Sequence, residues 1–119
     1  MRDGGVFVHG DAGTEIVPEL QPAAGEALIQ KHTLSPFAGT GLGELLTREK
    51  VGTVVLAGFV THYVIQATGF AAYDAGYNVI VLKDCCASGS AERHNHALAV
   101  LDPLAECLDS GTFLSRLDS

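Results

Sequence analysis

Two polar side chains, Thr61 and His62, follow a bend directly after the apolar run of residues 51–59. The bend is marked by Gly58 and is followed by a helical pattern. Nucleophiles are often mounted on strand-to-helix bends of this kind, and backbone N–H groups there stabilise oxyanions. The position at which a nucleophile would be sought is Val64, whose side chain has no nucleophilic atom. The bend therefore predicts the backbone of a site for covalent catalysis, but the residue at the nucleophile position cannot react.

Cysteine and histidine residues offer two alternative chemistries. Cys85 and Cys86 follow an apolar run, so we weigh a substitute nucleophile near the same sheet edge against a buried structural thiol. His94 and His96 could join them as zinc ligands, but the spacing matches no usual zinc site and adjacent cysteines chelate poorly. With Cys107 the cysteine count is odd, which does not suit a disulfide framework. We expect reduced, largely buried thiols and no metal.

The bulk composition bounds the class of protein. The chain has 119 residues, enough for one domain spanning residues 1–119. A net charge of −7 with scattered basic residues argues against nucleic-acid binding. No apolar run approaches the roughly 20 residues that cross a bilayer, and the first residues lack the apolar stretch of a signal peptide. We expect a cytoplasmic location and no membrane partner.

The elements that position the bend alternate between strand and helix patterns. Residues 51–59 are continuously apolar, as in a strand buried on both faces. Residues 62–75 are apolar nearly all round, which predicts a well-buried helix. Further strands are expected at residues 6–8, 27–32, 77–82 and 112–114. Further helices are expected at residues 41–49, capped by Thr40, and at residues 91–101, capped by Ser90. Past Pro103, the apolar face of the second helix continues through Leu104, Cys107 and Leu108 and stops at Gly111. This order predicts an α/β sandwich with a mostly parallel sheet.

Several stretches, taken in order, resemble the isochorismatase-like cysteine hydrolase superfamily, which includes isochorismatases, nicotinamidases and N-carbamoylsarcosine amidases. The resemblance runs from about Gly10 to Leu114. Its segments are residues 13–20, residues 26–31 ending in Lys31, the Ser-x-Phe-x-Gly-Thr loop at residues 35–40, the turn at residues 58–62, and residues 72–84 and 96–98. Each match is weak alone, whereas their order and spacing together are specific. The resemblance implies a three-layer, Rossmann-like α/β sandwich.

The family mechanism uses a cysteine thiolate, an aspartate base and a lysine. Lys31 corresponds to the family lysine, and Val64 occupies the nucleophile position, three residues after Thr61. The aspartate belongs to a segment that precedes Met1, and neither Asp3 nor Asp11 follows a credible buried strand. We therefore expect the C-terminal two-thirds of the usual fold, with the N-terminal strands missing.

Five residues are candidates for the site. Lys31 is expected in the pocket by resemblance, or else is a solvated lysine at a strand end. Phe37 lines the pocket as the family loop does, or packs in the core. Thr61, His62 and Tyr63 lie on the bend, where His62 either contacts a ligand or caps the helix.

The resemblance leaves two functions open. In the first, the chain is a hydrolase homologue for an amide or vinyl-ether bond of a small molecule, impaired by Val64. In the second, it is a non-catalytic module that binds a small ligand or another protein. No cofactor is implied. The expected partners are a small amide or carboxylate ligand and a second copy, because missing central strands leave unpaired edges that must be covered.

Overall fold

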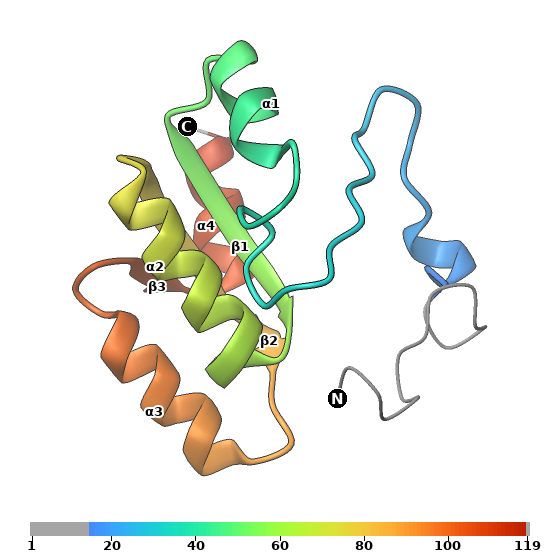
Figure 1. Cartoon of the computed structure of the whole chain (residues 1–119). Helices are drawn as coiled ribbons and strands as arrows, with labels where there is room; N and C mark the ends of the chain where they lie inside the picture. The colour runs from blue at the N-terminus through green and yellow to red at the C-terminus, as the bar shows by residue number, and fades with distance from the viewer. Residues whose placement is uncertain (1–14, 119) are drawn as a thin grey trace.

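The computed structural model describes residues 15–118 (Figure 1). The strand expected at residues 6–8 lies outside the described residues. The elements in chain order are η2 (Pro18–Leu20), α1 (Leu42–Arg48), β1 (Thr53–Phe59), the π-helical turn η3 (Thr61–Ile65), α2 (Gln66–Asp74), β2 (Asn78–Ala87), α3 (Ala91–Leu101), β3 (Glu106–Leu108) and α4 (Ser110–Leu117).

The described residues form one three-stranded sheet in the order β1-β2-β3, and both strand pairs are parallel. Figure 1 shows α2 and α3 in front of this sheet and α4 behind it. The central strand β2 supplies the innermost residue, Val81, which pairs with Leu56 on one side and Cys107 on the other. Ile65, Ala72 and Leu101 complete the buried core against it. The α/β sandwich with a parallel sheet is confirmed.

Two predicted caps are present. The hydroxyl of Thr40 accepts a hydrogen bond from the amide of Leu42 at 3.2 Å, where α1 begins. The hydroxyl of Ser90 accepts from the amide of Arg93 at 3.2 Å, which fixes the start of α3. Each cap satisfies one of the free N–H groups at a helix N-terminus. The helices predicted near residues 41–49 and 91–101 are therefore confirmed.

The predictions for the N-terminal half of the sheet were wrong in two respects. Residues 27–32 belong to no strand and are mostly exposed. Strand β1 is not buried on both faces, because Val55 is 39% and Phe59 is 61% exposed. Both errors have one cause: within the described residues β1 pairs only with β2, so its other edge and part of its surface have no cover.

The predictions for the C-terminal part were also wrong. The expected strand at residues 112–114 is helix α4, and Gly111 lies inside that helix rather than stopping it. Cys107 belongs to β3 instead of extending the apolar face of α3. The carboxylate of Asp84 accepts hydrogen bonds from both the amide and the hydroxyl of Ser110, so a tertiary contact starts a helix that local sequence does not predict.

The helix predicted at residues 62–75 forms, but as two parts. It opens with the π-helical turn η3 and continues as α2. Its burial is less complete than the apolar pattern suggested: Thr68, Gly69 and Ala72 are buried, whereas Tyr73 is exposed. Gly69 lies close against α3, since a Cβ there would lie 2.8 Å from the Leu101 side chain.

Candidate functional site

The bend between β1 and η3 begins at Gly58. Its φ of +131° is a conformation that only glycine adopts without strain. The pairing register between β1 and β2 shifts between Leu56 and Gly58, so that Gly58 lies beside Cys86. The peptide bond between Phe59 and Val60 is cis. The carboxyl ends of β1 and β2 are thus brought together where the bend starts, as the sequence predicted.

The backbone amides of the turn have acceptors within the protein. The N–H groups of Tyr63, Val64 and Ile65 all donate to the carbonyl of Val60, at 3.3, 2.9 and 3.1 Å. The amide of His62 points to the hydroxyl of Ser88 at 3.4 Å. An oxyanion hole needs N–H groups aimed at the substrate. The turn therefore does not present a preorganised pair of free amides at residues 62–65.

Two histidine–hydroxyl pairs hold the bend to the end of β2 and to α3. The buried hydroxyl of Thr61 lies 2.8 Å from Nδ1 of His94. Nδ1 of His62 lies 3.0 Å from the hydroxyl of Ser88. The ring of His62 also packs beside the exposed ring of Tyr63, with centroids 4.3 Å apart. The structure thus brings Thr61, His62 and Tyr63 together with two residues that the sequence did not single out as partners.

A sequence signal for these two partners did exist. Ser88 comes directly after β2, whose carboxyl end meets that of β1, and His94 lies one helical turn into α3. The carboxyl ends of adjacent parallel strands share one edge of the sheet. Applying that rule to the residues after β2 would have placed Ser88 and the start of α3 beside the bend.

Val64 is half-buried within η3. Its carbonyl accepts a hydrogen bond from the Thr68 hydroxyl at 2.6 Å, and its amide is held by Val60. The backbone that would carry a nucleophile is therefore well fixed. The side chain it carries is aliphatic, so the turn itself supplies no thiolate.

The cysteines differ from the expectation of largely buried thiols. Cys85 is exposed, while Cys86 and Cys107 are half-buried, and all three are free. Burial raises the pKa of the Cys86 thiol, and the neighbouring Cys85 and Cys107 raise it further, although a hydrogen bond from the Gly58 backbone opposes this. Nucleophilic cysteines have a lowered pKa. Cys86 lies beside the bend, but its pKa is raised rather than lowered.

The described part of the chain holds no group of three or more His, Cys, Asp or Glu residues arranged to bind a metal ion. Zinc requires about four converging ligands in a structural site. The pairs that His62 and His94 make are with hydroxyl groups rather than with acidic or thiol ligands.

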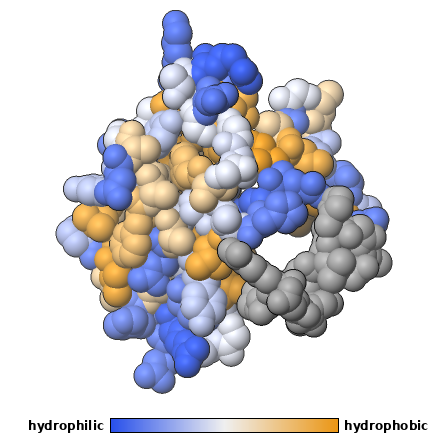
Figure 2. Space-filling view, in the orientation of Figure 1, coloured by the Kyte–Doolittle hydropathy of each residue, from blue (hydrophilic) through white to orange (hydrophobic). Residues whose placement is uncertain are grey.

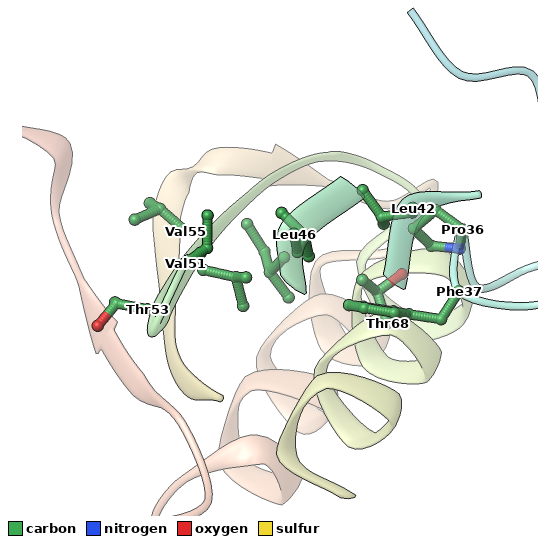
Figure 3. A pocket seen from close by; sticks show the side chains of 10 residues that line it. Pro36, Phe37, Leu42, Leu46, Val51, Thr53, Val55 and Thr68 are labelled. Atoms are coloured by element: carbon green, nitrogen blue, oxygen red, sulfur yellow. The ribbon is translucent and has the colours of Figure 1, made fainter. Parts of the chain in front are cut away.

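The two remaining candidates lie on other parts of the molecule. Lys31 is exposed and its Nζ donates to the carbonyl of Thr33 at 2.9 Å. Figure 1 shows its segment running apart from the sheet. Phe37 is half-buried, packs against Tyr77 with ring centroids 6.0 Å apart, and lines an apolar pocket of ≈ 340 Å³ with Thr68 (Figure 3). Thr68 connects this pocket to the bend through its hydrogen bond to Val64.

A parallel sheet with helices on both faces, and a strand-to-helix bend that mounts position 64, define a Rossmann-like α/β domain. The family model of the isochorismatase domain matches residues 1–111. The chain therefore belongs to the isochorismatase family. No helix within residues 15–118 is long and apolar enough to cross a membrane.

Named relatives and solved structures agree with this family. The chain is 33% identical over 114 residues to the secreted isochorismatase effector Isc1 of Verticillium dahliae, covering 95% of this chain and 60% of that protein. It is 32% identical over 112 residues to maleamate amidohydrolase of Pseudomonas putida, covering 86% of this chain and 53% of the enzyme. An isochorismatase-like hydrolase from Alkaliphilus metalliredigens superposes with a TM-score of 0.87 at 32% identity, over 91% of this chain and 59% of that one. The chain thus spans about 60% or less of the length of these relatives.

Proposed function

We propose that this chain is an isochorismatase-family hydrolase homologue that performs no thiolate chemistry of its own and binds a small amide or carboxylate at the bend. One observation carries the proposal: Val64 occupies the turn η3 that would mount the nucleophile. Covalent hydrolysis of an amide needs a nucleophilic atom at that place, and valine has none. The internal hydrogen bonds of the amides at residues 62–65 support the same conclusion.

Cys86 is the alternative nucleophile. It lies across from Gly58, within the same sheet edge. Its thiol is half-buried and its pKa is raised by that burial, so the thiolate is disfavoured at neutral pH. We therefore assign Cys86 a structural role.

The side chains that remain available for binding are His62 and Tyr63. The imidazole of His62 uses Nδ1 with Ser88, and Tyr63 is 51% exposed. Together they present an aromatic surface and a polar imidazole edge, which suits a small planar amide or carboxylate. Maleamate and nicotinamide are reasonable probes, since two relatives are named for acting on them.

The test combines turnover with binding. We expect no ammonia release from maleamate or nicotinamide, while either compound shifts the backbone amide resonances of residues 61–63 in NMR titrations. His62→Ala should abolish the shifts, and His96→Ala, which changes an exposed histidine of α3, should leave them. Turnover that iodoacetamide abolishes by alkylating Cys86 would overturn the proposal.

A second candidate function is an interaction module. The observation that favours it is the uncovered apolar surface around β1, where Val55 and Phe59 are exposed. If neither probe shifts any resonance at the bend, the binding half of the proposal fails and the interaction module becomes the better account.

A further inference from the structure

Ser88 and His62 form a hydroxyl–imidazole pair with the geometry of a nucleophile and its base. The hydroxyl oxygen of Ser88 lies 3.0 Å from Nδ1 of His62 and 3.4 Å from the backbone amide of the same residue. An amide N–H can only donate, so the oxygen accepts there and keeps its own hydrogen for Nδ1. The usual separation between a nucleophile and its base is about 2.6–3.2 Å.

Contacts within the protein hold both members of this pair in place. Ser88 directly follows β2, whose carboxyl end is paired with that of β1. His62 directly follows Thr61, whose buried hydroxyl lies 2.8 Å from Nδ1 of His94 on α3. The strand pairing and the second hydroxyl–imidazole contact therefore fix the approach of Ser88 to His62. Reacting groups that are positioned before the substrate arrives lower the entropic cost of a reaction.

The surroundings of the pair indicate which substrate it suits. Ser88 and His62 are both half-buried. The ring of Tyr63 is exposed, and its centroid lies 4.3 Å from that of His62. Figure 2 shows hydrophobic and hydrophilic side chains interspersed on the face of the molecule that carries α2 and α3. An aromatic face beside the base suits the offset stacking of an aryl group, so an ester of a phenol fits this pair.

Two features limit the pair to bonds that break easily. Within residues 15–118, no carboxylate forms an ion pair with His62, so no acidic group orients its imidazole. The amides of residues 63–65 donate to the carbonyl of Val60, so they do not stabilise an oxyanion. A phenolate is a far better leaving group than an amine. The pair is therefore expected to cleave aryl esters and to leave amides intact.

We propose that Ser88 and His62 act together as nucleophile and base in the hydrolysis of small aryl esters. The Ser88 oxygen bonds to the acyl carbon while its proton passes to Nδ1 of His62, and the bond from that carbon to the phenol oxygen breaks. The departing phenolate takes the proton from His62. Water then attacks the acyl-serine and gives a proton to Nδ1, and the Ser88 oxygen leaves and takes that proton back. The products are a carboxylic acid and a phenol, so no co-reactant is needed.

This activity goes beyond the proposed function, which concerns binding at the bend and the lack of thiolate chemistry. The first test is multiple-turnover release of p-nitrophenol from p-nitrophenyl acetate by the full chain. Ser88→Ala and His62→Gln should each lower the rate above buffer by at least about tenfold, because a positioned base contributes roughly 10²- to 10⁴-fold in efficient enzymes.

Two matched controls address hydrolysis by surface side chains. Ser115→Ala changes an exposed serine whose hydroxyl donates to a carbonyl, and His96→Ala changes an exposed histidine of α3. Both variants should keep the wild-type rate. Equal losses in Ser88→Ala and in the controls, or no turnover above buffer in the wild type, would sink the proposal.

A fluorophosphonate probe, which labels activated serines, identifies the nucleophile in the wild-type protein directly. Peptide mass spectrometry should locate the adduct on Ser88, and His62→Gln should abolish the labelling. Cys86→Ala separates the hydroxyl from the neighbouring thiol, and this variant should keep both the adduct and the ester hydrolysis. An adduct on a different residue, or hydrolysis that disappears in Cys86→Ala, contradicts the assignment to Ser88.

NMR titration with maleamate separates this inference from the proposed function. Ser88→Ala retains His62 and Tyr63, so the resonances of residues 61–63 should still shift while ester hydrolysis is lost. If the wild type shows no shift but its hydrolysis depends on Ser88, only the binding proposal fails. If the shifts persist and Ser88→Ala hydrolyses the ester as fast as the wild type, only the esterase inference fails.

Discussion

The two edges of the described sheet are built in opposite ways. Strand β3 has three residues, includes the charged Glu106, and is followed immediately by α4. Strand β1 has seven residues, all uncharged, and leaves Val55 and Phe59 exposed. Short length, charge and a covering helix are the usual protections of an edge strand. The β3 edge is short and carries a charge, whereas the β1 edge is long and carries none.

The two edges differ in how their polar and apolar side chains are satisfied within the described residues. At the β3 edge, Asp84 bonds to Ser110 and Arg116 bonds to Glu106, so side chains from β2, β3 and α4 satisfy one another. At the β1 edge the exposed side chains are uncharged: Val55 and Phe59 are apolar, and Thr53 carries a hydroxyl. An unpaired apolar edge gains free energy by association, whereas a charged edge loses hydration when it is covered. Within the described residues, the β1 edge is therefore the part of the sheet whose apolar side chains are least covered.

The largest expected effect comes from a core substitution, which tests whether strands β1 and β3 are stabilised by the same buried core. Leu101 is 1% exposed and packs against α2. Leu101→Ala should lower the free energy of unfolding by about 2–5 kcal/mol, through lost burial and the cavity left behind. Denaturant unfolding measures the loss. Hydrogen exchange should show that the amides of β1 and β3 lose protection together, as in a single cooperative unit.

Leu117→Ala is the control for this prediction, because the exposed Leu117 should change stability by less than about 0.5 kcal/mol. If exchange accelerated in β3 while β1 kept its protection, the two edges would belong to separate cooperative units. The comparison between them would then describe two substructures rather than one sheet.

The features that the sequence predicted correctly are those with local signals, and the features that it missed depend on tertiary contacts. The parallel strands β1 and β2 and the caps of α1 and α3 were predictable because apolar runs and capping residues are local signals. The assignment of Val64 to the nucleophile position rests on the family resemblance, three residues after Thr61, and not on a local signal. Helix α4 was not predictable, because its start depends on a carboxylate 26 residues away. The exposure of β1 was missed since an apolar run does not show whether a neighbouring strand covers it.

The site divides similarly. Thr61 and His62 were placed at the bend because the turn itself identifies them. Their partners His94 and Ser88 come from beyond the next strand, so the contacts depend on how β1 and β2 align. The position of Lys31 was predicted from a strand that residues 27–32 do not form. Strand formation requires a partner with free hydrogen-bonding groups, which no single segment reveals.

A smaller effect is expected from the hydrogen bonds that join Asp84 of β2 to Ser110 at the start of α4. The hydroxyl and amide of Ser110 donate to the Asp84 carboxylate at 2.6 and 2.8 Å, and these hydrogen bonds lower the pKa of Asp84 below its ordinary 3.8. A depressed pKa stabilises the folded state at neutral pH, and the contribution is lost as the pH falls through the folded-state pKa. Asp84→Asn should therefore lower the melting temperature at pH 7 by a few degrees, and the difference from the wild type should shrink below about pH 4.

Thermal melts of both proteins between about pH 7 and pH 3 check this expectation. Asp109→Asn is the matched control, because Asp109 is the N-cap of α4 but its side chain makes no capping hydrogen bond. A deficit of Asp84→Asn that stays constant across the pH range would show that shape rather than charge holds α4 in place.

The smallest effect concerns the ion pair on the β3 edge itself. Nη1 and Nη2 of Arg116 bond to the two carboxylate oxygens of Glu106 at 2.9 and 2.7 Å, and each side chain is 50% exposed. The bonds from Arg116 lower the pKa of Glu106, so the pair contributes at neutral pH and its contribution is lost in acid. Water and salt screen an exposed ion pair. The coupling free energy from a double-mutant cycle of Glu106→Gln and Arg116→Gln should therefore be smaller than the loss of stability caused by Asp84→Asn. Denaturant unfolding at low salt and at about 1 M salt should show that coupling vanish as the ionic strength rises. A coupling that persists at about 1 M salt would contradict this expectation and would show that the geometry of the pair, rather than its charge, stabilises the β3 edge.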